Sequence, residues 1–388
     1  MEWKEYIFTD VATLTNGRAY LQPELQSSGK YKIVRVGNLS GGDKWFYSDM
    51  ELSENKYCNK GDLLYAWACS FGPYIWNEDK TIYHYHIWKV EENSAVTDKM
   101  FLYYYLKYYT PKWMGLTNGS VMMHITKASL EKQKIHLPSL EEQHRIASIL
   151  SSLDDKIAVN RKICENLEAQ AQALFKHWFI DFAPFKDGKF VESELGMIPE
   201  GWKVGTLGEI VDLIKPSIKP QENVVYSHYS IPAFDNNQAP SQDNGESIKS
   251  NKFSIQDSVT MLSKLNPDHK RIWYVDKVDC NAVCSTEFLP FYAKNKEQSV
   301  FVYCYLNCMQ NYREIANGAK GTTNSHQRID ANAILTRKLA YNNDDITRFC
   351  NLVEDFMKQK DIAIKENRRL STLRDTLLPK LMKGEIEV

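Results

Sequence analysis

The most regular hydrophobic pattern of the chain runs through residues 139–183, where apolar or small residues recur at alternating steps of three and four. This heptad spacing, with polar residues at most other positions, predicts a helix that packs along a narrow apolar stripe. Ser139 and Glu142 form a capping-box start, and Pro184 marks the end. Such a helix is about 55 Å long and needs a partner helix. The stripe consists of Ile146, Leu150, Leu153, Ile157, Asn160, Cys164, Leu167, Ala171, Leu174 and Trp178.

The predicted partner lies at the other end of the chain, in residues 343–388. When the two segments are aligned so that Arg145 matches Arg348, the positions of the first stripe correspond to a second stripe. The second stripe is less apolar in its middle, because Lys360 and Arg374 lie on it. Each stripe also contains an asparagine, a residue that can fix helix register when buried. Two unrelated amphipathic helices, each packed on its own domain, are the alternative. The second stripe consists of Phe349, Val353, Phe356, Lys360, Ala363, Asn367, Leu370, Arg374, Leu377 and Leu381.

The rest of the chain repeats as well, which favours one duplicated unit over two unrelated helices. WKEYIFTDVATL from Trp3 matches WKVGTLGEIVDL from Trp202, and FLYYYLKYY from Phe101 matches FVYCYLNCM from Phe301. Gly-Ser-x-x-x-His and Gly-Thr-x-x-x-His occur near the ends of the two halves. The predicted order is domain 1–138, helix 139–183, linker 184–201, domain 202–342 and helix 343–388.

Each half is expected to be a mixed α/β module, so the predicted fold class is α+β or mixed, with two duplicated domains and two long helices. A helix is predicted over 100–114, around the aromatic run. Residues 216–246, rich in Asn, Gln, Pro and Ser, are expected to form loops rather than core. Strands are predicted over 31–37, 61–67, 82–90, 135–137, 258–263, 272–275 and 282–285.

Composition and charge narrow the classes of function. The chain has 388 residues, 43% hydrophobic and 25% charged, as in ordinary globular proteins. Its net charge of −1 gives no global basic field, so nucleic-acid binding has to come from a local surface. No stretch is apolar enough to span a membrane, and eight cysteines without a disulfide framework indicate a reducing, cytoplasmic setting.

Motifs of catalysis are missing from the sequence. None of the 13 prolines is adjacent to another, so the Pro-Pro motif of amino-methyltransferases is absent. No Gly-Lys pair is followed by Ser or Thr, so there is no P-loop. The pairs Cys280/Cys284 and Cys304/Cys308 have spacing unlike a zinc ribbon. The sequence therefore predicts a chain that is not an enzyme and holds no metal.

LFKHWFIDF from Leu174, SELGMIPEGWKVGTLGEI from Ser193 and LRDTLLPKLMKGEI from Leu373 resemble the specificity (S) subunit of type I restriction–modification enzymes. The resemblance covers the whole chain, including the duplicated layout. It implies two target-recognition domains separated by two antiparallel helices, a coiled coil, in a pseudo-twofold arrangement. Each domain would read one half of a split, asymmetric double-stranded DNA sequence. The helices would dock two modification subunits, which carry S-adenosylmethionine and methylate adenine. Restriction subunits, with ATP and Mg, would join them.

Residues that contact DNA are expected to be donors and acceptors on loops, and the Gly-Ser and Gly-Thr loops are the sharpest candidates. A solvated loop side chain remains the alternative for each of them, and the Tyr-rich helix is expected to be core. Exposed aromatic residues near the helix ends, Phe175, Trp178 and Phe179, are the candidates for docking the modification subunits. The DNA-binding candidates are Arg18, Lys30, Lys32, Arg35, Asn38, Ser70, Asn118, Ser120, His124, Lys127, Lys215, Lys219, Asn236, Asn237, Lys264, Asn266, Lys320, Thr322, Thr323, Asn324 and Arg328.

Two other functions remain open at this level. The chain could be a coiled-coil interaction scaffold whose globular domains do not read DNA. A stand-alone nuclease or methyltransferase is disfavoured by the missing motifs. The target sequence and the spacer between its halves cannot be derived from the residues.

Overall fold

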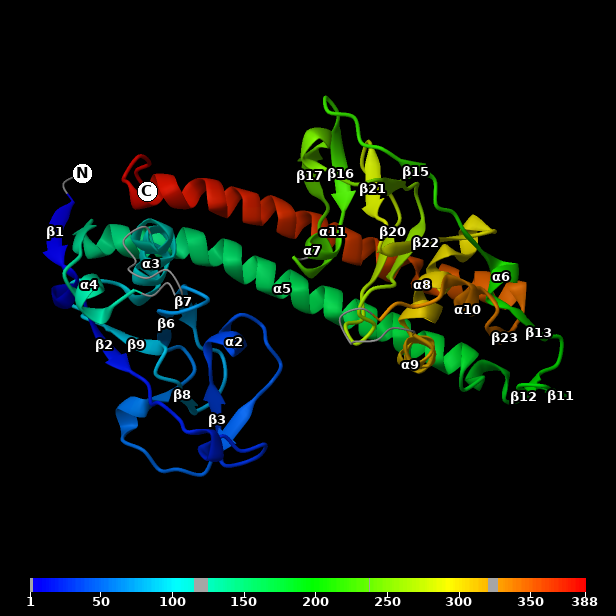
Figure 1. The fold of residues 1–388 in the computed structure, drawn as a ribbon, viewed down its shortest axis with the longest axis horizontal. Helices are drawn as coiled ribbons and strands as arrows, with labels where there is room; N and C mark the ends of the chain where they lie inside the picture. Colours follow the sequence, from blue (N-terminus) through cyan, green and yellow to red (C-terminus); the bar gives the residue numbers. More distant parts are fainter. Residues whose placement is uncertain (1–2, 115–124, 237, 320–326) are drawn as a thin grey trace. The chain divides into compact units, whose positions relative to one another are not determined.

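Two long helices and two compact units organise the chain. The computed structural model describes residues 3–114, 125–236, 238–319 and 327–388. Unit 1 comprises Met1–Lys156 and Leu370–Val388, and unit 2 comprises Ile157–Arg369. Both boundaries fall inside the helices α5 (Leu140–Phe179) and α11 (Asn343–Met382), each of 40 residues (Figure 1). The two predicted long helices are confirmed.

Unit 1 is built on two four-stranded sheets. The first has the order β2-β9-β6-β7 and is antiparallel, and the second has the order β4-β3-β8-β5, with β3 and β8 parallel. A separate antiparallel ladder joins β1 to β10. The strands are β1 (Lys4–Ile7), β2 (Ala12–Asn16), β3 (Tyr31–Val34), β4 (Phe46–Ser48), β5 (Tyr57–Cys58), β6 (Leu63–Ala66), β7 (Gly72–Ile75), β8 (Thr81–Tyr83), β9 (Ile87–Glu92) and β10 (Lys134–Leu137).

Unit 2 repeats this topology. One sheet has the order β14-β22-β19-β20, the other the order β15-β18-β21-β16-β17 with β16 and β21 parallel, and β13 pairs with β23. Sheet for sheet, this is the strand order of unit 1 with one added edge strand, β15, so the internal repeat is a structural duplication. The strands are β13 (Lys203–Thr206), β14 (Val211–Leu213), β15 (Ser217–Ile218), β16 (Val225–Tyr229), β17 (Ser241–Asn244), β18 (Lys252–Ser254), β19 (Val259–Ser263), β20 (Ile272–Val275), β21 (Ala282–Ser285), β22 (Phe288–Ala293) and β23 (Lys338–Tyr341).

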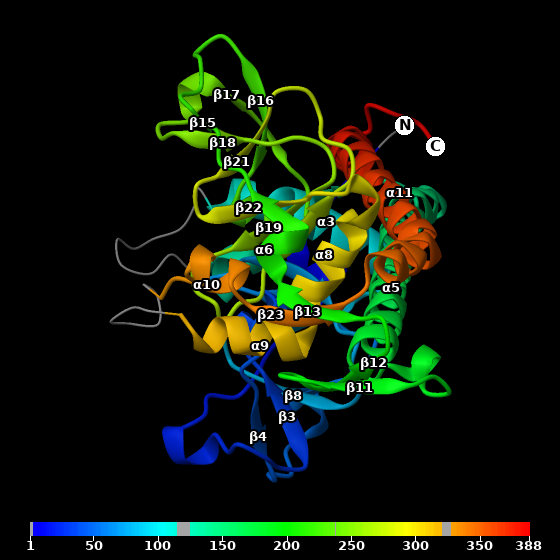
Figure 2. The same cartoon turned by 90° about the vertical axis from the view of Figure 1, so that its right-hand side faces the viewer.

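The shorter helices are duplicated too. In unit 2, α8 packs on β19, β20 and β22. Figure 2 shows α8 beside β19 and β22. The helices of unit 1 are α1 (Phe8–Val11), α2 (Val36–Leu39), α3 (Lys99–Met114) and α4 (Lys127–Glu131). Those of unit 2 are α6 (Leu207–Ile210), α7 (Ile231–Asp235), α8 (Ser299–Asn307), α9 (Met309–Asn317) and α10 (Ala331–Leu335).

Strand β6 explains how the layers of unit 1 are held together. All four of its residues are buried, because alternate side chains point to opposite faces of a strand. Leu63 and Tyr65 enter the core formed with α3, and Leu64 and Ala66 enter a second core formed with the other sheet. The strand predicted over 61–67 is therefore present as β6, and the structure shows that both of its faces are covered.

Within each unit α5 and α11 run antiparallel and bury their apolar stripes. In unit 1, Ile146 and Leu150 share a core with Leu378 and Leu381. In unit 2, Asn160 donates to the Asn367 side chain at 3.0 Å. Further along α5 in unit 2, Glu168 contacts Lys360, so the position on α11 falls as that on α5 rises and the pairing there is antiparallel.

Both cations that interrupt the second stripe are paired. In unit 1, Arg374 donates to Asp154 at 2.5 Å, and Tyr104 of α3 donates to the same carboxylate at 2.8 Å. In unit 2, Lys360 donates to Glu168, which also accepts from Tyr303 of α8. Each polar contact therefore ties the helix pair to the aromatic helix of its own unit.

Glu168 is half-buried and ionised. Burial alone raises the pKa of this carboxyl, but the charge of Lys360 and the hydrogen bonds from Lys360, Tyr303 and Asn307 outweigh it. Its pKa is therefore held below the ordinary value, as expected for a buried carboxylate that has a cationic partner.

Three expectations about strands and loops need correction. The span 216–246 is not all loop, because β16 lies inside the second sheet of unit 2 with Tyr226 and Tyr229 buried. The predicted strand 82–90 is two strands, β8 and β9, separated by a turn at 84–86. The linker 184–201 contains the hairpin of β11 (Phe190–Ser193) and β12 (Gly196–Pro199).

Candidate nucleic-acid interface

An aromatic surface lies at the end of β6 in unit 1. Trp67, the residue after β6, pairs its backbone N–H with His86 O at 3.2 Å and donates its indole N–H to Tyr85 O at 2.8 Å. Its ring lies 5.0 Å from the His86 ring and 5.9 Å from that of Tyr85, which is 37% exposed. Stacking on Trp88 at 5.7 Å holds the indole from the sheet side.

Two arginines flank the turn at 84–86. Tyr85 N donates to Arg18 O at 2.9 Å on one side, and His84 N donates to Val34 O, next to Arg35, at 3.0 Å on the other. Gly17 allows this approach, because a Cβ there would lie 2.3 Å from Tyr83 O. The backbones beside both arginines therefore border the aromatic surface, and a combination of cations and aromatic rings is common in nucleic-acid-binding sites.

The two histidines of this turn are neutral at physiological pH. Burial, together with the neighbouring His86 and Arg35, lowers the pKa of His84 to about 4. Burial and Arg35 also lower the pKa of His86. The positive charge of this surface therefore comes from the arginines.

The loops beside this surface are fixed by their own hydrogen bonds. Asn38 accepts from Arg35 N at 3.0 Å and donates to the carbonyls of Gly42 and Lys44. Ser40 and Ser70 share a hydrogen bond of 2.9 Å. The structure thus brings the predicted residues Arg35, Asn38 and Ser70 to one loop cluster, in which the amide of Asn38 organises the loop.

The corresponding end of β19 in unit 2 carries charges. Arg328 donates two hydrogen bonds to Glu287, at 3.2 and 3.3 Å, and Lys264 Nζ lies 4.0 Å from the same carboxylate. Asn266 follows in the left-handed region with φ 51° and pairs with Gln327 O. The predicted residues Lys264, Asn266 and Arg328 are therefore neighbours.

Other predicted cations lie elsewhere in unit 1. Arg18 pairs with Glu24 at 2.6 Å, although its backbone borders the aromatic surface. Lys30 pairs with Glu51 and Lys32 with Glu78, and Lys127 donates to Leu14 O. These contacts hold the fold of the unit and leave the lysines outside the loop cluster.

In unit 2, Lys215 and Lys219 are exposed on either side of β15, and Asn236 is exposed after α7. The remaining candidates lie outside the described residues; they are Asn118, Ser120, His124, Asn237, Lys320, Thr322, Thr323 and Asn324.

Sequence reasoning missed Trp67, Tyr85, His86 and Glu287. The alternating run from Tyr83 to Trp88 was interpreted as one strand, so its exposed turn was not recognised. Glu287 was not among the candidates, which were chosen from basic, amide, hydroxyl and histidine side chains on loops. The sequence signal that could have revealed this turn is the interruption of the apolar residues between positions 84 and 86.

The expected exposure of the three docking candidates is wrong. Phe175 is 1% exposed, and Trp178 and Phe179 are each 8% exposed. They pack with Phe301 and Phe349 in the core of unit 2. The helices expose other apolar side chains instead, namely Val159, Ile163, Leu352, Ile362 and Leu373.

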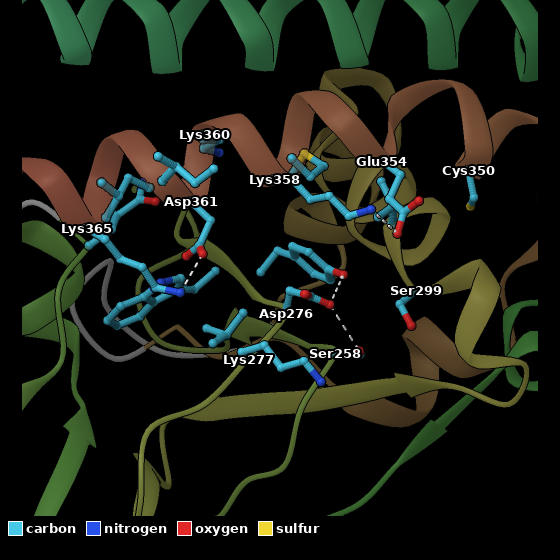
Figure 3. Close-up of a pocket in the computed structure, with 18 of the residues that line it drawn as sticks. Ser258, Asp276, Lys277, Ser299, Cys350, Glu354, Lys358, Lys360, Asp361 and Lys365 are labelled. Carbon is cyan, nitrogen blue, oxygen red and sulfur yellow. Dashed lines mark hydrogen bonds and ion pairs between the residues drawn. The ribbon is translucent and has the colours of Figure 1, made fainter.

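Unit 2 also contains a cavity of 860 Å³ along α11 (Figure 3). Tyr274 and Asp276 line it from the sheet side, and acidic and basic residues line it in nearly equal number. On α11, Glu354 pairs with Lys358 at 2.9 Å and Asp361 with Lys365 at 2.6 Å. Because these charges neutralise one another along the helix, the lining favours no ion of either sign.

Among the described residues there is no group of three side chains that could hold a metal ion. All eight cysteines are free. No helix in the described part of the chain is both long and apolar enough for a membrane span.

Comparison with known proteins agrees with this architecture. Residues 1–169 match the family described as the type I restriction modification DNA specificity domain. The MjaIX specificity subunit of Methanocaldococcus jannaschii is 29% identical over 314 residues, which are 77% of this chain and 71% of that protein. The HindI specificity subunit of Haemophilus influenzae is 28% identical over 204 residues, 48% of this chain and 42% of that protein.

A solved structure has the same fold. The S subunit of a type I restriction–modification system from M. genitalium covers 98% of this chain and 96% of its own length, with a TM-score of 0.58 and 18% identity. The sequence matches are therefore to a DNA specificity domain and to specificity subunits of type I restriction–modification enzymes, and the structural match shows the fold of such a subunit.

Proposed function

We propose that this chain is the non-catalytic, DNA-reading subunit of a type I restriction–modification complex. Unit 1 and unit 2 each read one half of a bipartite, asymmetric site. The observation that carries this proposal is the duplication: two units share one strand order but present different polar side chains at the same sheet end. Two copies of one reader with different surfaces are what an asymmetric, two-part target requires.

The helices α5 and α11 dock two modification subunits in this proposal. The exposed apolar residues Ile362 and Leu352 of α11, 64% and 53% exposed, support a protein contact there. S-adenosylmethionine then belongs to the modification subunits, and ATP and Mg to the restriction subunits that they recruit. The complex would act in the cytoplasm, where chromosomal and entering DNA are both accessible.

Selection of DNA tests the proposal. The chain, purified together with its modification subunits, is mixed with a library of random duplexes, and the retained duplexes are sequenced. We expect one motif of two short specified blocks separated by an unspecified spacer of fixed length. Stable assembly without any enriched motif would contradict the proposal and favour a coiled-coil scaffold that does not read DNA.

A further inference from the structure

The same arrangement of backbone hydrogen bonds recurs in both units, with aromatic side chains in unit 1 and charged side chains in unit 2. Trp67 N donates to His86 O at 3.2 Å and Ile125 N to Trp67 O at 3.2 Å, while Lys264 N donates to Glu287 O and Ile329 N to Lys264 O, both at 2.9 Å. Two residues further on, Cys69 and Asn266 both adopt the left-handed region, with φ 63° and 51°. Trp67 therefore corresponds to Lys264, and His86 corresponds to Glu287.

Packing does not dictate the side chains at this site. The strands that lead into it, β6 and β19, are buried at every residue in both units, but Lys264 and Glu287 keep 27% and 28% of their side-chain surface. Because both leading strands are buried while the residues at their ends are partly exposed, the side chains at the ends are available to contact a ligand.

Cations and their acidic partners lie at this end of unit 2. The backbone of Arg271 pairs with Ser263 at the end of β19 and its side chain pairs with Asp235, while Arg328 and Lys264 meet at Glu287. Lysines and arginines at one edge are what a phosphate backbone attracts. Phosphate repels a carboxylate at such an edge, so Glu287, once Arg328 leaves it, is suited to a hydrogen-bond donor on a base edge.

The geometry points to this recurring site as the position where each unit selects a base pair. The site is Trp67–His86 in unit 1 and Lys264–Glu287 in unit 2, and the inference rests on the proposed function. In unit 2, Glu287 accepts from the cytosine amino group, and Arg328, released from the carboxylate, donates to the guanine of the same pair. In unit 1, the neutral aromatic surface of Trp67, Tyr85 and His86 contacts a thymine methyl group instead.

The chemistry of each pair explains the assignment. Cytosine offers a donor and guanine two acceptors in the major groove, so a carboxylate with a bidentate arginine complements one C·G pair. In the free protein Arg328 and Glu287 satisfy each other, which keeps both side chains ordered at this edge. The uncharged rings of unit 1 offer no such complement.

Substitutions at Glu287 and Arg328 test the assignment in the complex with the modification subunits. Glu287→Gln and Arg328→Gln are compared with the wild type by the same DNA selection. Both are expected to reduce discrimination for C·G at one and the same base pair of the second half-site, by about 5- to 150-fold. Discrimination at every other position is expected to stay unchanged.

Asp212→Asn is the matched control. Asp212 lies opposite Tyr292, at the other end of β22, and is an exposed carboxylate 3.8 Å from Lys294. This variant should retain the wild-type motif. Thermal unfolding of each complex shows that the variants fold.

The outcomes separate the two proposals. A wild type that selects a bipartite motif, with variants that select the same motif unchanged, overturns the base-pair assignment and leaves the proposed function standing. A uniform, salt-dependent loss marks phosphate contacts and also overturns it. A wild type that selects no motif overturns both proposals.

Discussion

The Asn160 side chain of α5 donates a hydrogen bond of 3.0 Å to the Asn367 side chain of α11, and it donates a second one of 2.7 Å to Glu366. Asn160 is 2% exposed and lies between the buried stripe residues Ile157 and Leu167. A slip of either helix by one turn would leave these amides unpaired in an apolar environment. The pair therefore fixes the register of the two helices, as buried polar residues do in coiled coils.

This relationship predicts a non-additive effect. Asn160→Leu should lower the free energy of unfolding by about 1–3 kcal/mol, because the Asn367 amide loses its partner inside the helix pair. Combining it with Asn367→Leu should recover most of that loss. Chemical denaturation of the three variants measures the coupling, with the exposed Ser152→Ala on α5 as control. Strict additivity would show that the amides do not act together.

A larger penalty is expected at the buried charge pair of unit 2. Lys360→Met leaves Glu168 without its cation and should lower the free energy of unfolding by about 3–5 kcal/mol. Lys358→Met, which removes an exposed partner of Glu354 from the same helix, should cost much less, because water and salt screen the exposed pair. Chemical denaturation of the two variants measures both losses in unfolding free energy. Equal losses would mean that the Lys360 contact adds no more stability than an exposed ion pair.

The acid sensitivity of unit 1 should depend on His84. Its folded pKa of about 4 lies below the ordinary value of 6.5, so the unfolded chain binds more protons between these limits. The stability from neutral His84 is full above pH 6.5 and is lost as the pH falls toward 4. His84→Gln should therefore flatten the decline in unfolding free energy between pH 7 and pH 5. His177→Gln, on the exposed side of α5, should keep the wild-type slope, and identical slopes for both variants would contradict this assignment.

Docking on the helix pair predicts which apolar residues matter. Ile362→Asp combined with Leu352→Asp should abolish co-purification of the modification subunits without changing thermal unfolding, since both side chains are exposed. Leu21→Asp, a 72% exposed residue of unit 1, should leave co-purification intact. Phe175→Asp is expected to unfold unit 2, because it places a charge in the core. Full assembly of the Ile362/Leu352 variant would move the docking surface elsewhere.

Much of the fold could be predicted from periodicity. Heptad spacing predicts α5 and α11, and the aromatic run from Phe101 predicts α3, because burial of one face leaves a pattern in the sequence. The span 216–246 could not be predicted. Strand β16 has buried serine and tyrosine positions in a run of polar residues, and only its pairing with β21 and β17 makes it a strand.

The candidate site was predicted in part. Lysine, arginine and asparagine on loops include Arg35, Lys264 and Arg328, which the structure places at the sheet ends. Their partners could not be derived, because the contact of Glu287 with Arg328 joins residues far apart in sequence. The buried state of Phe175 also escaped prediction, since the same heptad stripe faces a helix over most of its length and faces α8 near Phe301.

The independence of the two readers is the central claim, and one exchange tests it most directly. Residues 1–138 are replaced by the equivalent domain of a relative, and the complex with modification subunits is expressed in cells whose methylated sequences are then mapped by long-read sequencing. The account predicts that one half of the methylated motif changes while the other half and its methylation remain. A motif in which both halves change together, or neither changes, would contradict two units that read DNA separately.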